Sequence, residues 1–455
     1  MEKTESGAVA QMRENLERLR ELGVDPYPLR ADRSHTAVEV TGSFEELEGK
    51  EVTVAGRVMA VRGHGKAGFA DLVDRSGKVQ LYVREQDVDE QLLAVWKLLD
   101  VGDIVSARGE VFQTRSGEVS VKVTGLTMLA KALMPLPEKW HGLKDKELRY
   151  RQRYLDLISN DESRRVFEIR SDVLRISREF LVERGFIEVE TPVLQPIYGG
   201  AFARPFVTHH HALDMTLYLR IADELYLKRL IVGGLERVFE IGKDFRNEGL
   251  DRTHSPEFTQ LELYQAYADY HDMMELTEQL VERMAREIHG TTVIPWQAEK
   301  IDVAPPWTRV RVMDAVADAL GGEVPDDVSE LRDAARRAGV EVADDAGFGG
   351  IVEEVLSELV EPGFVRPTFL IDYPKSISPL AKQTPDEPEI VERFEFFAGG
   401  LELGNSFSEL NDPDEQRSRL LAQVEAREGG NAEAQGMDDD FVRALEHGMP
   451  PTGGL

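Results

Sequence analysis

The sequence contains no cysteine among its 455 residues. Disulfide bonds, zinc sites built on thiolates and a cysteine nucleophile are therefore excluded. The chain also lacks any run of about 18 apolar residues, the length that a membrane-spanning helix needs. Its first residues form a polar, charged segment and do not resemble a signal peptide. We therefore expect a soluble, cytoplasmic protein that does not bind membranes.

Positive charge is scarce. Lys and Arg number 54 against 84 Asp and Glu, which gives a formal net charge of −30. Such a balance argues against a protein that coats nucleic acid without regard to sequence, so any contact with RNA must use a local basic surface. Hydrophobic residues make up 42% and charged residues 30%, as in globular proteins. The length favours two or three domains.

The N-terminal part changes pattern near residue 50. Apolar residues recur every three or four positions in residues 8–23, which predicts an amphipathic helix, and residues 1–50 form this helix and a lead-in. Residues 51–134 instead contain five short β-rich runs separated by Gly- and Ser-bearing turns, with one helical stretch before the fourth run. This pattern predicts a five-stranded oligonucleotide-binding barrel.

A linker and a larger domain follow. Residues 135–160 are rich in Lys and Arg, and their prolines exclude a strand, so this linker could lie beside a polyanion. From residue 161 to 455, helical segments alternate with strands, which predicts an α+β domain. Residues 308–362 show helical periodicity and no strand signal until FVRPTFLID, so we expect a helical insertion there.

Two segments carry the residues that could perform chemistry. In FRNEGLDRTHSPEFTQLELY, Arg246 and Glu248 are predicted to share a strand face. Four residues of the return strand share a face as well: Phe258, Gln260, Glu262 and Tyr264. Together they offer a cation for phosphate or carboxylate, an aromatic plane for a base, and anions for a cationic substrate. A solvated amphipathic hairpin is the alternative.

The second segment is FEFFAGGLELGNSFSELND. It places Glu395, Glu402 and Glu409 seven residues apart, and it sets Asn405 and Phe407 on the strand face of Glu409. Carboxylates beside phosphate groups are typical of Mg²⁺ sites. Acidic residues at the edge of a sheet are an equally good interpretation of this segment alone.

Taken together, the strings GFIEVETPVLQP, GGAFARPF, ELYLKRL, FRNEG with HSPEF, YPKSISPLA and GNSFSELND resemble the bacterial class II lysyl-tRNA synthetases. The resemblance runs along essentially the whole chain. It implies an α+β fold in which an N-terminal five-stranded barrel precedes a catalytic domain with an antiparallel sheet flanked by helices. GFIEVETP resembles motif 1 of the family, with Pro192 at its hallmark proline, which implies a homodimer. FRNEG through PEFT resembles motif 2.

The resemblance also implies roles around ATP. Arg246 would hold the α-phosphate and the carboxylate of lysine, and Glu248 would recognise the edge of adenine. Phe258 would stack on the adenine ring, and His254 would approach the distal phosphates. The Mg²⁺ ligands would be Glu395 and Glu402.

The same resemblance assigns residues to the binding of lysine and of tRNA. Gly200 and Glu224 match the positions that bind the α-amino group, and Asn405 and Phe407 line the same pocket. The ε-ammonium site is matched by three residues: Glu262, Tyr264 and Glu409. An ammonium has three donors, which two carboxylates and a phenol oxygen can satisfy. The anticodon-reading positions of the barrel are matched by four residues: Arg62, Phe69, Gln80 and Glu118. Residues 51–86 hold six Lys or Arg and four acids, so this region is locally basic.

The expected activity is therefore lysine–tRNA ligase, with ATP, L-lysine and tRNA(Lys) as partners. The family continues beyond PPTGGL into motif 3, so we expect a catalytic domain truncated at Leu455 whose sheet lacks a central strand. That expectation alone favours a second hypothesis, a non-catalytic RNA-binding remnant of a synthetase. A third, an enzyme that adds lysine to another protein, is weakened by the complete barrel. Aspartyl and asparaginyl relatives share the architecture, but the predicted pocket suits a cationic side chain.

Overall fold

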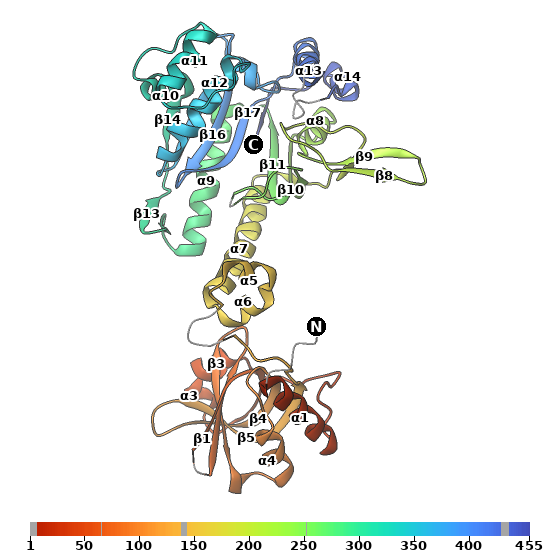
Figure 1. Ribbon diagram of the computed structural model, residues 1–455, viewed down its shortest axis with the longest axis vertical. Helices are drawn as coiled ribbons and strands as arrows, with labels where there is room; N and C mark the ends of the chain where they lie inside the picture. The colour runs from red at the N-terminus through yellow and green to blue at the C-terminus, as the bar shows by residue number, and fades with distance from the viewer. Residues whose placement is uncertain (1–6, 65, 138–142, 252, 429–435) are drawn as a thin grey trace. The chain divides into compact units, whose positions relative to one another are not determined.

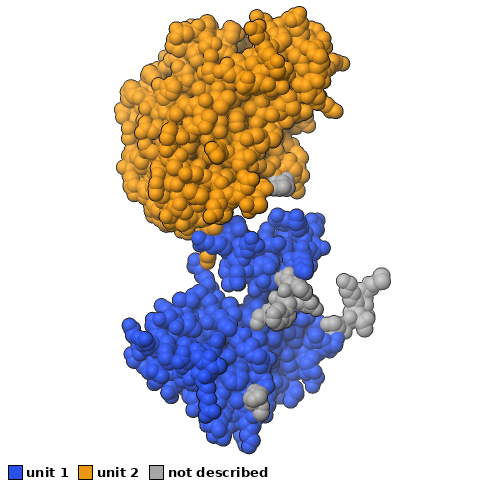
Figure 2. Space-filling view, turned by 90° about the vertical axis from the view of Figure 1, so that its left-hand side faces the viewer, with its two compact units in different colours: residues 1–167 blue, residues 168–455 orange. Residues whose placement is uncertain are grey.

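The computed structural model describes residues 7–64, 66–137, 143–251, 253–428 and 436–455. The chain divides into two compact units, residues 1–167 and residues 168–455. Figure 1 traces the elements along the chain, and Figure 2 shows the two units in different colours. The division falls within helix α7 (Asp161–Glu183), near the start that the sequence predicted for the catalytic domain. Among the described residues, no helix is both long and apolar enough to cross a membrane.

Five strands of the first unit close into a barrel in the order β1-β2-β3-β5-β4. They are β1 (Glu51–His64), β2 (Ala67–Val73), β3 (Lys78–Arg84), β4 (Ile104–Gln113) and β5 (Val119–Ala130). Helix α4 (Glu90–Lys97) lies between β3 and β4 along the chain. The predicted barrel, with one helix before its fourth strand, is therefore confirmed.

Alternation of apolar and polar residues explains the barrel. Val79, Leu81 and Val83 of β3 are buried, and the residues between them face outward. Helix α1 (Gly7–Glu21) packs Leu19 into the same core, as its periodicity predicts. Two short helices, α2 (Ala37–Gly42) and α3 (Phe44–Leu47), precede β1. Glycine is required at position 109, because a Cβ there would lie 2.1 Å from the carbonyl oxygen of Lys122.

The linker folds as two short helices where it is described, α5 (Lys146–Arg151) and α6 (Arg153–Ser159). Asp156 is fully buried between them. Its carboxylate accepts hydrogen bonds from Arg149 at 2.7 Å and from Arg153 at 2.6 Å. Arg149 and Arg153 of the linker therefore bind a carboxylate of the linker itself, that of Asp156. Residues 138–142 of the predicted linker lie outside the described residues.

The second unit is built on an eight-stranded sheet in the order β14-β15-β16-β17-β18-β11-β10-β6. Its strands are β6 (Ile187–Glu188), β10 (Arg237–Phe245), β11 (Glu257–Ala266), β14 (Thr308–Arg311), β15 (Thr368–Pro374), β16 (Ile390–Ala398), β17 (Leu401–Ser408) and β18 (Thr452–Gly454). Neighbours are antiparallel except at the two ends, where β6 and β14 pair in parallel with β10 and β15. A smaller sheet and a hairpin complete the strands: β7 (Leu194–Gln195), β8 (Val207–His210), β9 (Met215–Leu219), β12 (Val293–Trp296) and β13 (Glu299–Asp302).

Helices cover both faces of the large sheet (Figure 1). Helices α7 and α9 (Tyr270–His289) pack on the face that carries Phe239, Leu263 and Phe394. The opposite face meets two separate groups of helices. At one end these are α10 (Val312–Leu320), α11 (Val328–Arg337) and α12 (Phe348–Val355). At the other end they are α8 (Glu224–Val232), α13 (Pro413–Glu428) and α14 (Asp439–Glu446).

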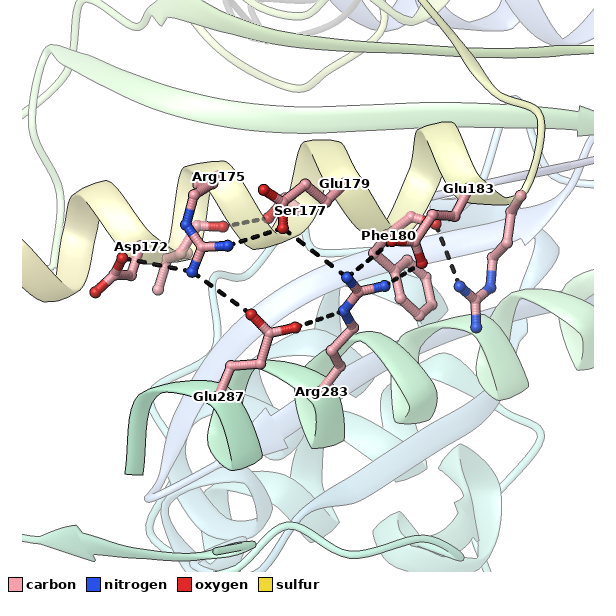
Figure 3. Close-up of polar contacts among 10 residues, drawn as sticks. Asp172, Arg175, Ser177, Glu179, Phe180, Glu183, Arg283 and Glu287 are labelled. Atoms are coloured by element: carbon pink, nitrogen blue, oxygen red, sulfur yellow. Dashed lines mark hydrogen bonds and ion pairs between the residues drawn. The ribbon is translucent and has the colours of Figure 1, made fainter. Parts of the chain in front are cut away.

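Helices α7 and α9 are also joined by ion pairs at their exposed sides (Figure 3). Arg283 of α9 binds Glu183 of α7 and, at 2.8 Å, Glu287 of its own helix. Glu287 in turn lies 3.5 Å from Arg175 of α7. Exposed ion pairs contribute about 0–1 kcal/mol each, so this network aligns the helices more than it stabilises them.

Two expectations about this unit are wrong. Residues 308–311, predicted to begin a helical insertion, form strand β14, which pairs in parallel with β15 through Val310 and Leu370. Helix periodicity begins only at Val312. A four-residue strand at the edge of a sheet is too short to show a strand period beside a longer helical one.

The sheet does not lack a central strand. Strand β18 lies between β11 and β17, where Gly454 pairs with both Tyr264 and Phe407. Leu455 extends this pairing through reciprocal backbone hydrogen bonds with Leu263 at 2.8 and 2.9 Å. The sequence TGG concealed the strand, because glycine has no side chain to show alternation.

Candidate active site

Several of the predicted site residues lie on one face of the large sheet. Phe239 of β10, Leu263 of β11 and Phe394 of β16 face α7 and α9. Because side chains alternate along a strand, Glu262 and Glu395 must face the opposite side, between the two groups of helices. The register of β16 and β17 aligns two of the candidates, since Glu395 of β16 pairs directly with Asn405 of β17. The fold therefore brings residues from distant segments to one surface.

Lys228 of α8 lies at the buried end of this surface. Its ammonium is fully buried and contacts Glu224 Oε1 at 2.5 Å and Glu409 Oε2. The rings of Phe407 and Phe441 lie 5.2 and 5.9 Å from Lys228 Nζ. Burial acts to lower the pKa of Lys228, but the two carboxylates outweigh burial and raise it. Lys228 therefore remains a cation that holds two predicted lysine-binding residues together.

Glu262 and Tyr264 form a second buried pair on β11. The hydroxyl of Tyr264 donates to Glu262 Oε2 at 3.2 Å. Burial, followed by the neighbouring Asp223, raises the pKa of Glu262 well above its ordinary value. Oxygens of Glu262 and Asp223 lie within 4.8 Å of each other. A cation that entered here would meet two buried carboxyl groups.

Arg220 organises the acidic residues beyond Glu262. It is almost wholly buried, and its guanidinium contacts Glu240 Oε1 at 2.6 Å and Asp244 Oδ1 at 3.0 Å. Burial, followed by the charge of Asp223, raises the pKa of Asp244 to about 7. Oxygens of Asp223, Asp244 and Glu262 lie within 4.8 Å of one another. One guanidinium thus faces several buried carboxyl groups, and the region attracts further positive charge.

The hairpin of β16 and β17 carries the predicted metal ligands. Glu395 accepts hydrogen bonds from Arg393 at 2.6 Å and from the hydroxyl of Tyr373 at 2.8 Å. Arg393 also donates to Asn405 Oδ1 at 2.9 Å. Glu402 is exposed, but partial loss of solvation, followed by the charge of Glu395, raises its pKa to about 7. Glu402 therefore lies in a negative environment that a divalent cation would relieve.

Arg246 and Glu248 follow β10, which ends at Phe245, so the prediction that they share a strand face is wrong. The backbone N–H of Arg246 still donates to the oxygen of Pro256 at 3.0 Å. The guanidinium of Arg246 lies 5.1 Å from the centre of the Phe258 ring. Glu248 is exposed. A cation and an aromatic plane therefore lie together, as the sequence predicted.

His254 and Gly200 occupy the periphery. His254 is exposed, and its Nδ1 lies 2.7 Å from Asp251 Oδ2. Backbone N–H groups of the turn, chiefly that of Thr253, and the ring of His254 lower the pKa of Asp251. Gly200 has φ +90°, and a Cβ there would lie 3.1 Å from that of Glu224. Glycine lets this loop pass close to the start of α8.

Three of the four predicted anticodon residues, Arg62, Phe69 and Gln80, lie on strands β1, β2 and β3 of the barrel, and Glu118 directly precedes β5. Phe69 of β2 pairs across the strands with Arg62 and with Tyr82, whose ring centroid is 5.2 Å away. Arg62 forms a two-pronged contact with Asp71 at 2.5 and 3.1 Å. Gln80 accepts a hydrogen bond from Ser120, and Glu118 lies 3.4 Å from Lys78. The barrel therefore presents an aromatic surface surrounded by polar groups.

Sequence reasoning missed three cations of the catalytic surface. Lys228 lies four residues after Glu224, a helical spacing typical of an ion pair, so this signal was available. Arg393 lies two residues before Glu395 and therefore on the same strand face, which was also readable. Arg220 has one local partner, Asp223 at 3.9 Å, but its closer contacts are with Glu240 and Asp244 on strand β10, which no local pattern reveals.

Known proteins are similar to this chain in both units. Residues 145–455 match the family described as tRNA synthetases class II (D, K and N), and residues 52–129 match the OB-fold nucleic acid binding domain. The lysine–tRNA ligase of Carboxydothermus hydrogenoformans is 51% identical over 459 residues, which cover 100% of this chain and 94% of that protein. The lysine–tRNA ligase of Moorella thermoacetica is 52% identical over 454 residues, which cover 99% and 93%. Matches over the whole chain give no support to the expected truncation.

Proposed function

We propose that this chain, which belongs to the class II tRNA synthetases, is a lysine–tRNA ligase. It would activate L-lysine with ATP to lysyl-adenylate and transfer the lysyl group to the 3′ end of tRNA(Lys). The observation that carries the proposal is the buried acidic pocket of Glu262, Tyr264 and Glu409. Uncharged amino acids would leave these carboxylates unpaired, which disfavours their binding.

Substrate lysine would use both of its ammonium groups. The ε-ammonium has three donors, and Glu262, Tyr264 and Glu409 offer the matching oxygens. The α-ammonium would bind Glu224 beside Gly200. Asn405 and Phe407 would line the space between them, while Arg246 would hold the α-carboxylate.

ATP would bind on the open side of the same surface. Phe258 would stack on the adenine ring, Glu248 would recognise its edge, and His254 would approach the distal phosphates. Arg246 would neutralise the α-phosphate while the carboxylate of lysine attacks the α-phosphorus in line, with pyrophosphate as the leaving group. Positioning and charge neutralisation supply most of such catalysis, and no protein nucleophile is required.

A Mg²⁺ ion fits the residues of the β16–β17 hairpin. The donor set is hard oxygen, and the charge of Glu395 adds to loss of solvation in raising the pKa of the neighbouring Glu402. Glu402 and Glu395 would hold the ion, which would supply positive charge to the phosphates. Arg393 and Tyr373 would orient Glu395 through the hydrogen bonds already described.

The barrel would read the anticodon of tRNA(Lys). Single-stranded bases stack on aromatic rings, and Phe69 offers such a ring beside Tyr82. Arg62, Gln80 and Glu118 offer polar groups for base edges. The locally basic composition of residues 51–86 supports contact with a polyanion despite the charge of the whole chain.

We further infer a homodimer that forms through motif 1. Strand β6 ends the strand order of the large sheet, so its outer edge has no strand neighbour among the described residues. Ile187 of β6 and Val182 of α7 are 50% and 57% exposed. Light scattering of the Ile187→Asp variant should give the mass of a monomer, whereas the unchanged chain should give twice that mass. Equal masses would contradict this interface.

Lysine-dependent exchange of pyrophosphate into ATP tests the proposed function. We expect exchange with lysine and no comparable exchange with aspartate or asparagine. Charging of tRNA(Lys) should follow when tRNA is added. Binding of tRNA without any exchange would contradict the proposal and favour a non-catalytic RNA-binding protein.

A further inference from the structure

Lys228 is not among the residues to which the proposed function gives a role, although it contacts two that have one. Its Nζ binds Glu224 Oε1 and Glu409 Oε2 simultaneously. The remaining directions around the ammonium are closed by the rings of Phe407 and Phe441. Lys228 is therefore held from all sides and cannot follow a substrate.

The carboxylate oxygens that Lys228 leaves open point in two directions. Glu224 Oε2 lies on the side of Gly200, where an added Cβ would be 3.6 Å from it. Glu409 Oε1 lies against β18 and Tyr264, since a Cβ on Gly454 would be 2.1 Å from this oxygen and 2.5 Å from Tyr264 Cε1. No described residue forms a hydrogen bond with Glu409 Oε1. One oxygen thus faces the proposed α-ammonium site and the other faces the proposed ε-ammonium site.

We propose that Lys228 is a positioning residue that fixes the spacing between Glu224 and Glu409 and thereby selects the length of the substrate's side chain. This inference rests on the proposed function. A single ammonium ties one oxygen of each carboxylate to the same point, so the outer oxygens keep a constant separation. A diamino acid must span that separation to bind both. Ornithine, which is one methylene shorter, cannot satisfy both carboxylates at once.

Two variants of the full chain test the inference. Lys228→Arg keeps the positive charge but brings a broader guanidinium that separates the carboxylates, and Lys228→Gln removes the charge. In both, the ratio of kcat/KM for lysine to that for ornithine in ATP–pyrophosphate exchange should fall by about 10-fold or more. One methylene supports discrimination of roughly 10- to 200-fold. The lower ratio should come from a higher KM for lysine, while the KM for ATP should stay nearly unchanged.

Lys131 provides a matched control in the other unit. It is equally buried and binds Asp100 at 2.5 Å and Asp103 at 2.9 Å. Lys131→Gln should leave the lysine-to-ornithine ratio unchanged. Circular dichroism and thermal unfolding should show that the Lys228 variants remain folded.

The other outcomes overturn the inference. An unchanged ratio in Lys228→Arg would assign Lys228 a role in charge balance alone. Equal losses for lysine and ornithine, or failure of both variants to fold, would make it a structural residue. Absence of lysine-dependent exchange in the unchanged chain would instead refute the proposed function itself, so the two failures are distinguishable.

Discussion

Replacing Asp244 by Asn should make the second unit more stable above neutral pH. Asp244 is fully buried on β10 beside Arg220, and Asp223 and Glu262 add negative charge to the same space. Burial and Asp223 outweigh Arg220 and raise the pKa of Asp244 from 3.8 to about 7. A carboxyl group with a raised pKa holds its proton more tightly in the folded chain. Its contribution to stability is therefore complete below about pH 4 and is lost as the pH rises through 7.

The size of this loss follows from the pKa difference. A shift from 3.8 to about 7 corresponds to about 4 kcal/mol between the acidic and the alkaline limit. Asparagine cannot ionise, so the variant should escape the loss, and its stability relative to the unchanged chain should rise by about this amount from pH 4 to pH 8. Its neutral amide resembles the protonated carboxyl group in shape and polarity.

Pulse proteolysis in urea can measure this difference, with the fragments of residues 168–455 identified by mass so that the second unit is followed alone. Asp302→Asn is a suitable control, because Asp302 is exposed and its pKa is lowered, chiefly by the backbone N–H of Ala304. That variant should gain nothing at alkaline pH. A stability difference between Asp244→Asn and the unchanged chain that stays constant across this pH range would refute the reasoning.

Three further predictions concern the substrates. Glu409→Gln should raise the KM for lysine roughly 10- to 100-fold in pyrophosphate exchange, because a charged hydrogen bond contributes about 1.5–3 kcal/mol. Equal increases in the KM for lysine and for ATP would contradict the assignment of Glu409 to the lysine site. Phe69→Ala should weaken tRNA binding in filter assays by about 1–3 kcal/mol, the worth of a base–aromatic stack; a parallel loss of lysine activation would identify Phe69 as a packing residue. Glu402→Gln should raise the Mg²⁺ concentration that gives half-maximal exchange. In the unchanged chain this Mg²⁺ concentration should fall as the pH rises through about 7, because the carboxyl group of Glu402 ionises there, and the variant should not show this fall. An unaltered Mg²⁺ dependence would argue against Glu402 as a ligand.

The barrel was predictable because its signals are local. Strict alternation, as in β3, identifies a strand that has one face in a core, and turns rich in Gly and Ser separate such strands. Strand β14 could not be predicted because four residues are too few to show the alternation of a strand. Strand β18 could not be predicted because its glycines carry no side chains to alternate, although Gly454 pairs with both Tyr264 and Phe407.

The sequence could place neighbouring candidate residues on one strand face, but it could not show which distant segments meet. Spacing within β11 placed Glu262 and Tyr264 on one face, and the structure keeps them within hydrogen-bond distance. The contact of Lys228 of α8 with Glu409, which directly follows β17, joins segments that lie far apart in the sequence, so no local pattern records it. The raised pKa of Glu262 likewise arises only because folding buries this residue beside Asp223 of another segment.

Strand β18 gives the folding of the pocket a particular order. The hairpins β10–β11 and β16–β17 join neighbours in sequence, so each can form early from local contacts. Gly454 joins the two hairpins, because it pairs with Tyr264 of one and Phe407 of the other. Its pairing with Tyr264 closes a very long loop of the chain. Closing that loop costs conformational entropy before the pairing gains any contact. Glu409 and Tyr264 lie close to each other beside Gly454, where the two hairpins are joined. We therefore expect the joint between the two halves of the sheet, and the arrangement of Glu409 and Tyr264 beside it, to form late in folding.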